Sequence, residues 1–167
     1  RTFKEFIAMM EQFYAGMQSI ATGSNPDRDY YTLEIALPAG SDQVIFYAGI
    51  PSDKVALFEK QVIGLFSHAR VVAVPDDYNN FIEGSAVVAA RGIAHTKEIL
   101  PIRTYDEFEA DPVDVLLNVF SKLETHTEGA ALQFIVTPVG DTYIQKYGKI
   151  LNKVREGEKL DDALKEK

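Results

Sequence analysis

The stretch ADPVDVLLNVFSKLETHTEGAALQFIVTPVG, residues 110–140, predicts a helix that leads into a strand. Asp111 is a suitable helix N-cap, and Pro112 fits the first helical position, where its missing N–H costs nothing. Apolar residues then recur at steps of three and four, as on the buried face of a helix: Val113, Leu116, Leu117, Phe120 and Leu123. The apolar run GAALQFIVTPV follows, and Pro138 ends it. The stretch holds no nucleophile, metal cluster or phosphate loop, so it predicts structure rather than chemistry.

The first fifty residues predict a helix and a hairpin. Residues 1–20 place Phe, Met and Ile side chains on one helical stripe, which is typical of a helix that faces a core. Apolar and polar residues alternate over residues 30–37, which predicts a strand with Thr32 and Glu34 on its polar face. Residues 44–50 predict a second strand. Because only a short turn separates the two strands, we expect them to pair antiparallel.

More strands and helices are expected between these two regions and at the end of the chain. A helix is predicted over residues 55–66, with Ser52 or Asp53 as its N-cap. Three apolar stretches predict strands and lie at residues 69–75, 85–93 and 97–105. Pro101 places the last of these at a sheet edge or a strand end, because proline cannot donate to a ladder. A final amphipathic helix follows residue 140 and frays into a linker after Gly157.

The order of these elements is one helix, then ββαβ twice, then one helix. It predicts an α/β (α+β) fold with a mixed or antiparallel sheet and packed helices. The repeated order allows two ferredoxin-like halves, 1–77 and 82–156, with the terminal helices added, or one continuous sheet. We expect a single domain over residues 1–156. Both ends of the chain look cut, so residues 157–167 are interpreted as a charged linker to a downstream region.

The composition excludes several classes of function. The 167 residues suffice for one domain with a real core, because a chain of this size buries about 70% of its unfolded surface. The net charge of -8 disfavours direct contact with nucleic-acid phosphates by this part of the protein. No cysteine is present, which excludes disulfides, thiol catalysis and cysteine-bound zinc. No apolar run approaches the length of a membrane span.

No residue pattern in the chain predicts a reaction centre. His68, His95 and His126 fall in three separate elements and lack partners at metal-ligand spacing. Arg70 and Arg91 could pair with an anionic ligand, although rim or salt-bridge roles explain them better. We therefore assign no catalytic residue, no cofactor and no metal ligand, and we expect that this chain by itself is not an enzyme.

Ten positions within residues 110–140 form a spaced pattern of DP, an apolar helix, SKL, an acidic residue with glycine, and then A, Q and P. They are Asp111, Pro112, Ser121, Lys122, Leu123, Glu128, Gly129, Ala131, Gln133 and Pro138. The pattern resembles the N-terminal domain that precedes the motor in type IV secretion-like, conjugative-transfer ATPases of candidate-phylum bacteria. Other stretches agree in order, among them residues 1–17, LEIAL at 33–37 and VPDDYNNF at 74–81. One departure is THTEG at 125–129, where the family more often has EEGE.

The resemblance implies a non-catalytic module that positions a motor at the cytoplasmic face of a membrane. In that family a membrane-spanning segment precedes the module and a RecA-like ATPase follows it. The implied partners are other subunits of a transfer complex, with a homo-oligomer formed through the full-length chain. We expect partner contacts at sheet edges and at the exposed face of the stretch 97–105, through Lys97, Arg103 and Tyr105.

A different class of function remains open on the sequence. The possible duplication, together with Arg70 and Arg91, also suits a small-molecule-sensing ferredoxin-like domain or a small enzyme of unknown type.

Overall fold

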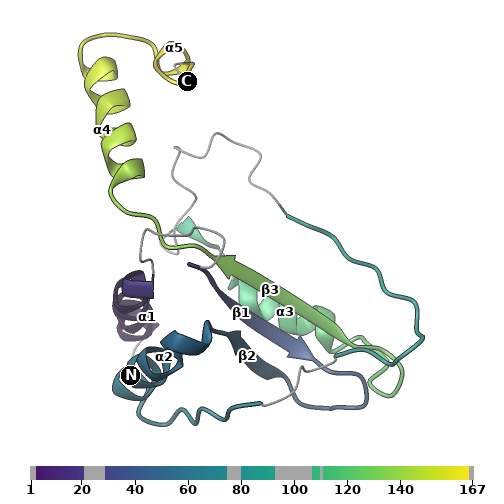
Figure 1. Cartoon of the computed structure of the whole chain (residues 1–167). Helices are drawn as coiled ribbons and strands as arrows, with labels where there is room; N and C mark the ends of the chain where they lie inside the picture. The colour runs from purple at the N-terminus through teal and green to yellow at the C-terminus, as the bar shows by residue number, and fades with distance from the viewer. Residues whose placement is uncertain (1–2, 21–28, 75–79, 93–106, 110, 166–167) are drawn as a thin grey trace. The chain divides into compact units, whose positions relative to one another are not determined.

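The computed structural model describes residues 3–20, 29–74, 80–92, 107–109 and 111–165 (Figure 1). The chain divides into two compact units. The first unit joins Arg1–Val88 with Ala110–Pro138, and the second joins Ala89–Glu109 with Val139–Lys167. The division into two ferredoxin-like halves, 1–77 and 82–156, remains a prediction.

The first unit is built on a three-stranded antiparallel sheet in the order β2-β1-β3. The strands are β1 (Tyr31–Leu37), β2 (Ile45–Gly49) and β3 (Ala130–Val136). β1 therefore takes the central place, with β2 on one edge and β3 on the other. This arrangement confirms the predicted hairpin and the predicted α+β class of an antiparallel sheet with packed helices.

The turn between β1 and β2 depends on a glycine. The Ser41 amide donates to the Pro38 carbonyl at 3.0 Å, which closes a four-residue turn. Gly40 is the third residue of this turn and has a φ of 84°, in the left-handed region that side chains disfavour. A turn that tight returns the chain directly alongside β1.

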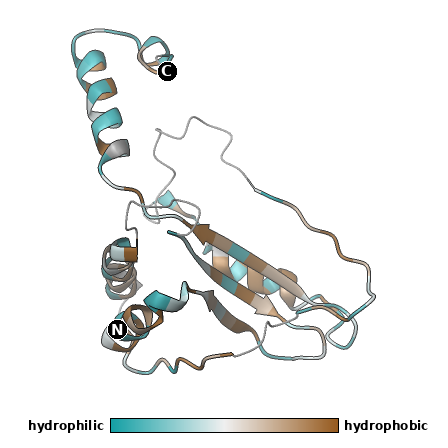
Figure 2. Ribbon diagram, in the orientation of Figure 1, coloured by the Kyte–Doolittle hydropathy of each residue, from teal (hydrophilic) through white to brown (hydrophobic). Residues whose placement is uncertain are grey.

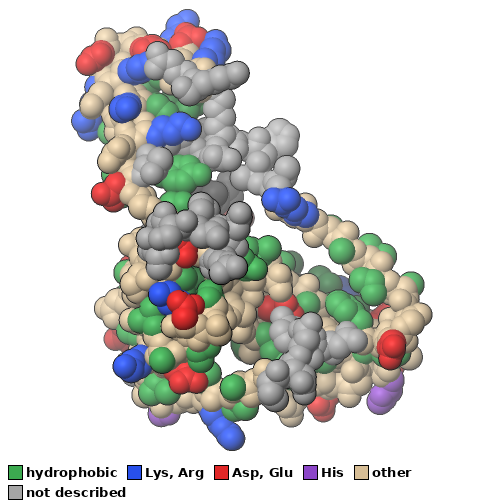
Figure 3. All heavy atoms as spheres, viewed as in Figure 1, with side chains coloured by type: hydrophobic (Ala, Val, Ile, Leu, Met, Phe, Trp, Pro, Cys, Tyr) green, Lys and Arg blue, Asp and Glu red, His purple; other side chains and the backbone are tan. Residues whose placement is uncertain are grey.

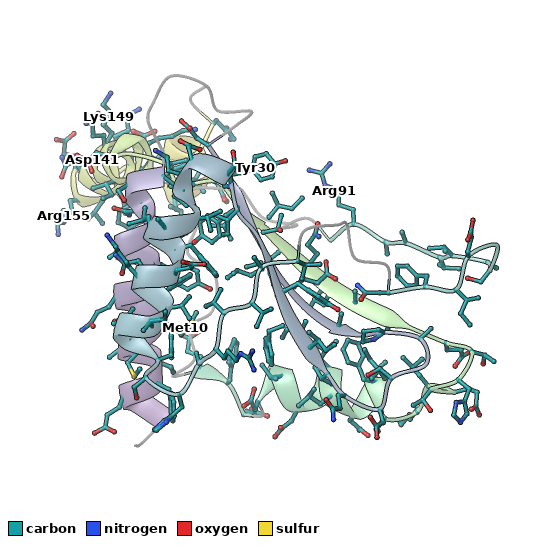
Figure 4. The ribbon with its side chains drawn as sticks, turned by 60° about the horizontal axis from the view of Figure 1, so that its bottom comes forward. Met10, Tyr30, Arg91, Asp141, Lys149 and Arg155 are labelled. Atoms are coloured by element: carbon teal, nitrogen blue, oxygen red, sulfur yellow. The ribbon has the colours of Figure 1, made fainter. Side chains whose placement is uncertain are left out.

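Two helices lie together beside the sheet in the first unit. They are α1 (Phe3–Met17), which continues into the 3-10 turn Gln18–Ile20, and α2 (Val55–Leu65). The two helices contact each other and run side by side in Figure 4. The predicted N-cap of α2 is wrong: Ser52–Lys54 form a 3-10 turn, and Lys54 takes the cap position without a side-chain hydrogen bond.

The third helix, α3 (Pro112–Phe120), lies behind the sheet in the view of Figure 1. Its start is as predicted, because the Asp111 carboxylate accepts a 2.8 Å hydrogen bond from the Val113 amide. Pro112 follows at the first helical position. The cap satisfies one of the amides that every helix leaves unpaired at its N-terminus.

The apolar core of the first unit lies where α1 meets the sheet. Phe13, Met17 and Ile20 are buried there together with Tyr31 of β1. The Phe13 ring meets the rings of Tyr31 and Phe58 edge to face, with centroids 6.4 and 6.0 Å apart. Such aromatic contacts add about 0.5–1.5 kcal/mol each to the burial of the rings. The second half of the helical stripe predicted for residues 1–20 therefore faces the core, whereas Phe6 and Tyr14 of the same stripe are 47 and 43% exposed.

Two predicted strands are not formed. Residues 69–74 and 85–92 are described, and neither belongs to a sheet. They are extended and apolar, as Figure 2 shows for residues 71–74, and the Val88 side chain is 97% exposed. A strand requires a neighbour that completes its ladder, and an apolar run without alternation does not reveal whether one exists. The third predicted strand, 97–105, lies outside the described residues.

The described residues of the second unit form two helices, α4 (Thr142–Arg155) and α5 (Leu160–Ala163). Figure 2 shows both polar and apolar residues along α4, in agreement with the amphipathic helix expected there. Gly157 ends that helix with a φ of 98°, and the Glu158 amide donates to the Lys153 carbonyl at 3.0 Å. The stretch expected to be a linker therefore contains one further helical turn.

Candidate functional site

A buried carboxylate on the central strand is the most unusual polar feature of the first unit. Glu34 is only 6% exposed. The Asn80 side-chain amide donates to Glu34 Oε1 at 2.7 Å, and the Gln133 side-chain amide donates to Oε2 at 2.8 Å. A carboxylate out of water is costly unless its oxygens are hydrogen-bonded. The two amides offset that cost, and we call these three residues the carboxylate clamp.

Three separate parts of the chain supply the carboxylate clamp. Glu34 belongs to the polar side of β1, as its alternation predicts, and Gln133 lies directly opposite it on β3 in the strand register. Asn80 comes from the connection after α2 and is itself only 5% exposed. The clamp thus fastens the connection at residue 80 to both strands.

The backbone around Asn80 reinforces this fastening. The Asn80 carbonyl accepts a 2.9 Å hydrogen bond from the Ala39 amide, and the Thr125 carbonyl accepts one of 2.6 Å from Gly40. Gly129 packs against this junction so closely that a Cβ atom there would collide with the Asn80 carbonyl and lie 2.8 Å from the Ala39 nitrogen. Only glycine fits this position without a shift of backbone.

The clamp leaves one hydrogen-bond acceptor without a donor. Asn80 Oδ1 is buried and has no partner within the part of the chain that the structure describes. Its amide nitrogen already faces the carboxylate, so turning the amide over would bring two acceptors together. The three clamp side chains supply hydrogen bonds and one negative charge, which suits the positioning of chain segments.

The opposite face of β1 is apolar, and it shifts the pKa of one titratable residue, Tyr31. Burial raises the pKa of Tyr31 to about 12, and the neighbouring Tyr14 adds to the shift. The cause is that the phenolate would lose its hydration in the core between the sheet and α1. Tyr31 is therefore a neutral core residue at physiological pH.

The residues expected to contact partners lie outside the described residues: Lys97, Arg103 and Tyr105. Arg70 and Arg91, considered as anion ligands, are both exposed, and neither forms an ion pair within the described ranges. Figure 4 labels Arg91, which belongs to the second unit, whereas Arg70 belongs to the first.

The described residues hold neither a metal-binding cluster nor a membrane-spanning helix. No three His, Asp or Glu side chains within them are grouped so that they could hold a metal ion. Among the helices formed by those same residues, none combines the length and the apolar character that crossing a bilayer requires.

The sequence did not predict the carboxylate clamp, although each of its three residues lies in a stretch that the sequence analysis considers. Glu34 was expected on the polar face of a strand, Gln133 was one of the ten pattern positions, and Asn80 lies in VPDDYNNF. The missing information was the pairing of β1 with β3, which joins residues 99 positions apart. A polar residue in the middle of an otherwise apolar strand is the local signal that could have pointed to Gln133.

Comparisons with known proteins do not add a relative. No protein-family model matches the chain, and neither the curated proteins nor the solved structures contain a match.

Proposed function

We propose that this chain is a non-catalytic positioning domain of a membrane-associated, type IV secretion-like DNA-transfer ATPase, where it mediates assembly and partner contacts. The observation that carries the proposal is that several residues of the family pattern, Asp111, Glu128, Gly129 and Gln133, make structural contacts. They cap, pack and fasten chain segments, as expected of a module whose task is to present surfaces.

Four pattern positions illustrate this. Asp111 caps α3, and Glu128 Oε2 accepts a 2.9 Å hydrogen bond from the Glu124 amide in the loop before β3. Gly129 allows the close approach of three backbone segments, and Gln133 binds the buried Glu34. A pattern that marked a reaction centre would instead collect groups that transfer protons or phosphate.

The decisive experiment is to determine the complete coding sequence on both sides of these residues. The proposal expects a hydrophobic span of roughly 20 residues upstream and a phosphate-loop ATPase downstream. If instead the reading frame encodes neither, the proposed function is wrong.

A biochemical measurement tests the non-catalytic part of the proposal. The isolated 167-residue chain is expected to hydrolyse ATP no faster than a heat-denatured sample. Turnover at a rate of about 1 per second or more, typical of enzymes, would contradict a purely positioning role.

A further inference from the structure

The helix α4 differs in charge from every other helix that the described residues form. It includes Lys146, Lys149, Lys153 and Arg155 and no acidic residue. Among the other helices, α1, α3 and α5 are net acidic and α2 is neutral. Lys and Arg side chains gather over α4 in Figure 3, and Figure 4 shows Lys149 and Arg155 directed away from it. Since the whole chain has 17 basic and 25 acidic residues, α4 is a basic segment of an acidic protein.

The apolar side chains of α4 form a stripe along one side of the helix. At 3.6 residues per turn they fall within an arc of about 120°. They are Tyr143, Ile144, Tyr147, Ile150, Leu151 and Val154. Lys146 and Lys153 border this stripe on one side, and Arg155 borders it on the other. Cations therefore flank the stripe along both of its long edges.

The first half of the stripe is exposed. The exposed fractions of Tyr143, Ile144 and Tyr147 are 40, 71 and 46%. In the second half, Ile150 and Leu151 are half-buried, and α5 contacts α4. The surface left for another molecule is thus the first half of the stripe together with the cations beside it.

We propose that α4 binds the surface of a membrane that contains anionic lipid. The helix lies parallel to the plane of the bilayer, and the exposed half of the stripe enters the boundary between head groups and acyl chains. The flanking cations meet the lipid phosphates. This inference goes beyond the proposed function, which assigns the membrane contact to a segment upstream of these residues.

The arrangement of side chains favours a lipid surface over an acidic protein or a nucleic acid. Lysine and arginine beside an apolar stripe bury their methylene stems and keep their charges at the level of the head groups. Tyr143 and Tyr147 suit the same boundary, because a tyrosine ring is apolar and its hydroxyl is polar. A site for phosphates or carboxylates alone has no use for an apolar side chain as exposed as that of Ile144.

Charge complementarity holds in spite of the net charge of -8. Each lysine or arginine close to an anionic leaflet strengthens binding about fivefold. Along the sequence, the acidic residues nearest to α4 are Asp141 and Glu156, one beyond each end of the helix. Acidic groups farther than about 8 Å from the lipid are largely screened in physiological salt.

The test measures co-sedimentation of the 167-residue chain with lipid vesicles. Vesicles of phosphatidylcholine with roughly one third phosphatidylserine are compared with vesicles of phosphatidylcholine alone. The chain is expected to bind the anionic vesicles at least about tenfold more tightly than the neutral ones. Salt at about 1 M is expected to remove most of that difference.

A double charge reversal assigns the binding to α4. Lys146→Glu combined with Lys149→Glu is expected to weaken binding to the anionic vesicles at least about tenfold. The matched control combines Lys60→Glu with Lys122→Glu, two exposed lysines of the first unit. It changes the net charge by the same amount and is expected to alter binding less than about threefold.

A second variant tests the apolar part independently. Ile144→Glu is expected to weaken binding about tenfold, because a carboxylate then replaces the most exposed apolar side chain of the stripe. Ile63→Glu on α2 is the matched control, since Ile63 is 57% exposed, and it is expected to leave binding unchanged. Circular dichroism of each variant identifies any loss that comes from unfolding.

Three results would overturn the inference. One is the absence of binding to the anionic vesicles at every lipid concentration. The second is equal binding to both kinds of vesicle, or equal loss in the Lys60 and Lys122 control. The third is binding to soluble polyglutamate as tight as to vesicles and unchanged by Ile144→Glu, which would assign α4 to an acidic protein. The coding sequence around the chain tests the proposed function separately, so each idea can fail alone.

Discussion

The two faces of β1 are held by different kinds of interaction. On one face Tyr31 packs into an aromatic and aliphatic cluster against α1, where non-directional burial provides the stability. On the other face Glu34 accepts two hydrogen bonds from amides that belong to distant segments. The apolar face tolerates repacking, whereas the polar face requires particular atoms at particular distances. The hydrogen bonds of the polar face therefore fix which segments meet there.

The largest loss of stability is expected from a substitution in the core on the apolar face of β1. Phe13→Ala removes a ring that touches three other aromatic rings, and the cavity it leaves should cost about 3–5 kcal/mol of unfolding free energy. Urea denaturation followed by circular dichroism measures the loss. Phe46→Ala is the control, because Phe46 is 74% exposed and its truncation should cost less than about 1 kcal/mol. Equal costs for the two variants would refute the proposed core.

The next largest effect is expected from a substitution at the junction where Gly129 packs against the Ala39–Asn80 backbone hydrogen bond. Gly129→Ala places a Cβ against both partners of the Ala39–Asn80 backbone hydrogen bond, so we expect a loss of about 3 kcal/mol. Gly140→Ala, where no atom lies within 4 Å of the new Cβ, should be close to neutral. Thermal unfolding of the two variants compares them directly. A Gly129→Ala protein as stable as the wild type would mean that the three segments do not meet there.

The burial of Tyr31 on the apolar face also predicts how the unfolding free energy depends on pH. Tyr31 stays neutral in the folded protein up to a pKa of about 12, whereas the unfolded chain ionises from about pH 10. Its contribution is therefore complete below pH 10, and about 2–3 kcal/mol should be lost as the pH rises to 12. Unfolding free energies measured across this window give the loss. Tyr31→Phe should remove this part of the pH dependence, and Tyr30→Phe, at the exposed neighbour, should keep it.

The smallest effect tests the carboxylate clamp. Glu34→Gln preserves the shape but turns one acceptor into a donor that faces another amide N–H, which should cost about 2 kcal/mol. Glu11→Gln on the exposed side of α1 is the matched control and should change stability by less than about 0.5 kcal/mol. Chemical denaturation distinguishes them. A neutral Glu34→Gln would show that the clamp does not hold the two strands and residue 80 together.

Local chemistry predicted much of this fold. Asp111 and Pro112 predict the start of α3, and the alternation around Glu34 predicts β1. Both features depend on residues close by in the sequence, which is why the sequence alone reveals them. The predicted cap of α2 failed because a 3-10 turn at Ser52–Lys54 precedes the helix, and such a turn uses the same polar residues as a cap.

Features that depend on distant partners were not predictable. The apolar runs at 69–74 and 85–92 resemble strands, yet only a neighbouring ladder makes a strand, and none among the described residues adjoins them. The carboxylate clamp was missed for the same reason. Glu34 and Gln133 meet only because β1 and β3 pair, and nothing local to either residue encodes that register.

The pairing of β1 with β3 has a consequence for how the protein is made. The β1–β2 hairpin can form as soon as it leaves the ribosome, but Gln133 is synthesised 99 positions after Glu34. At roughly 5–20 residues per second, the central strand waits about 5–20 s with one edge open. During that interval we expect the carboxylate at position 34 to be hydrated and to discourage the nascent strand from pairing with a neighbouring chain. The group that fastens the finished sheet would then also protect the sheet while it is incomplete.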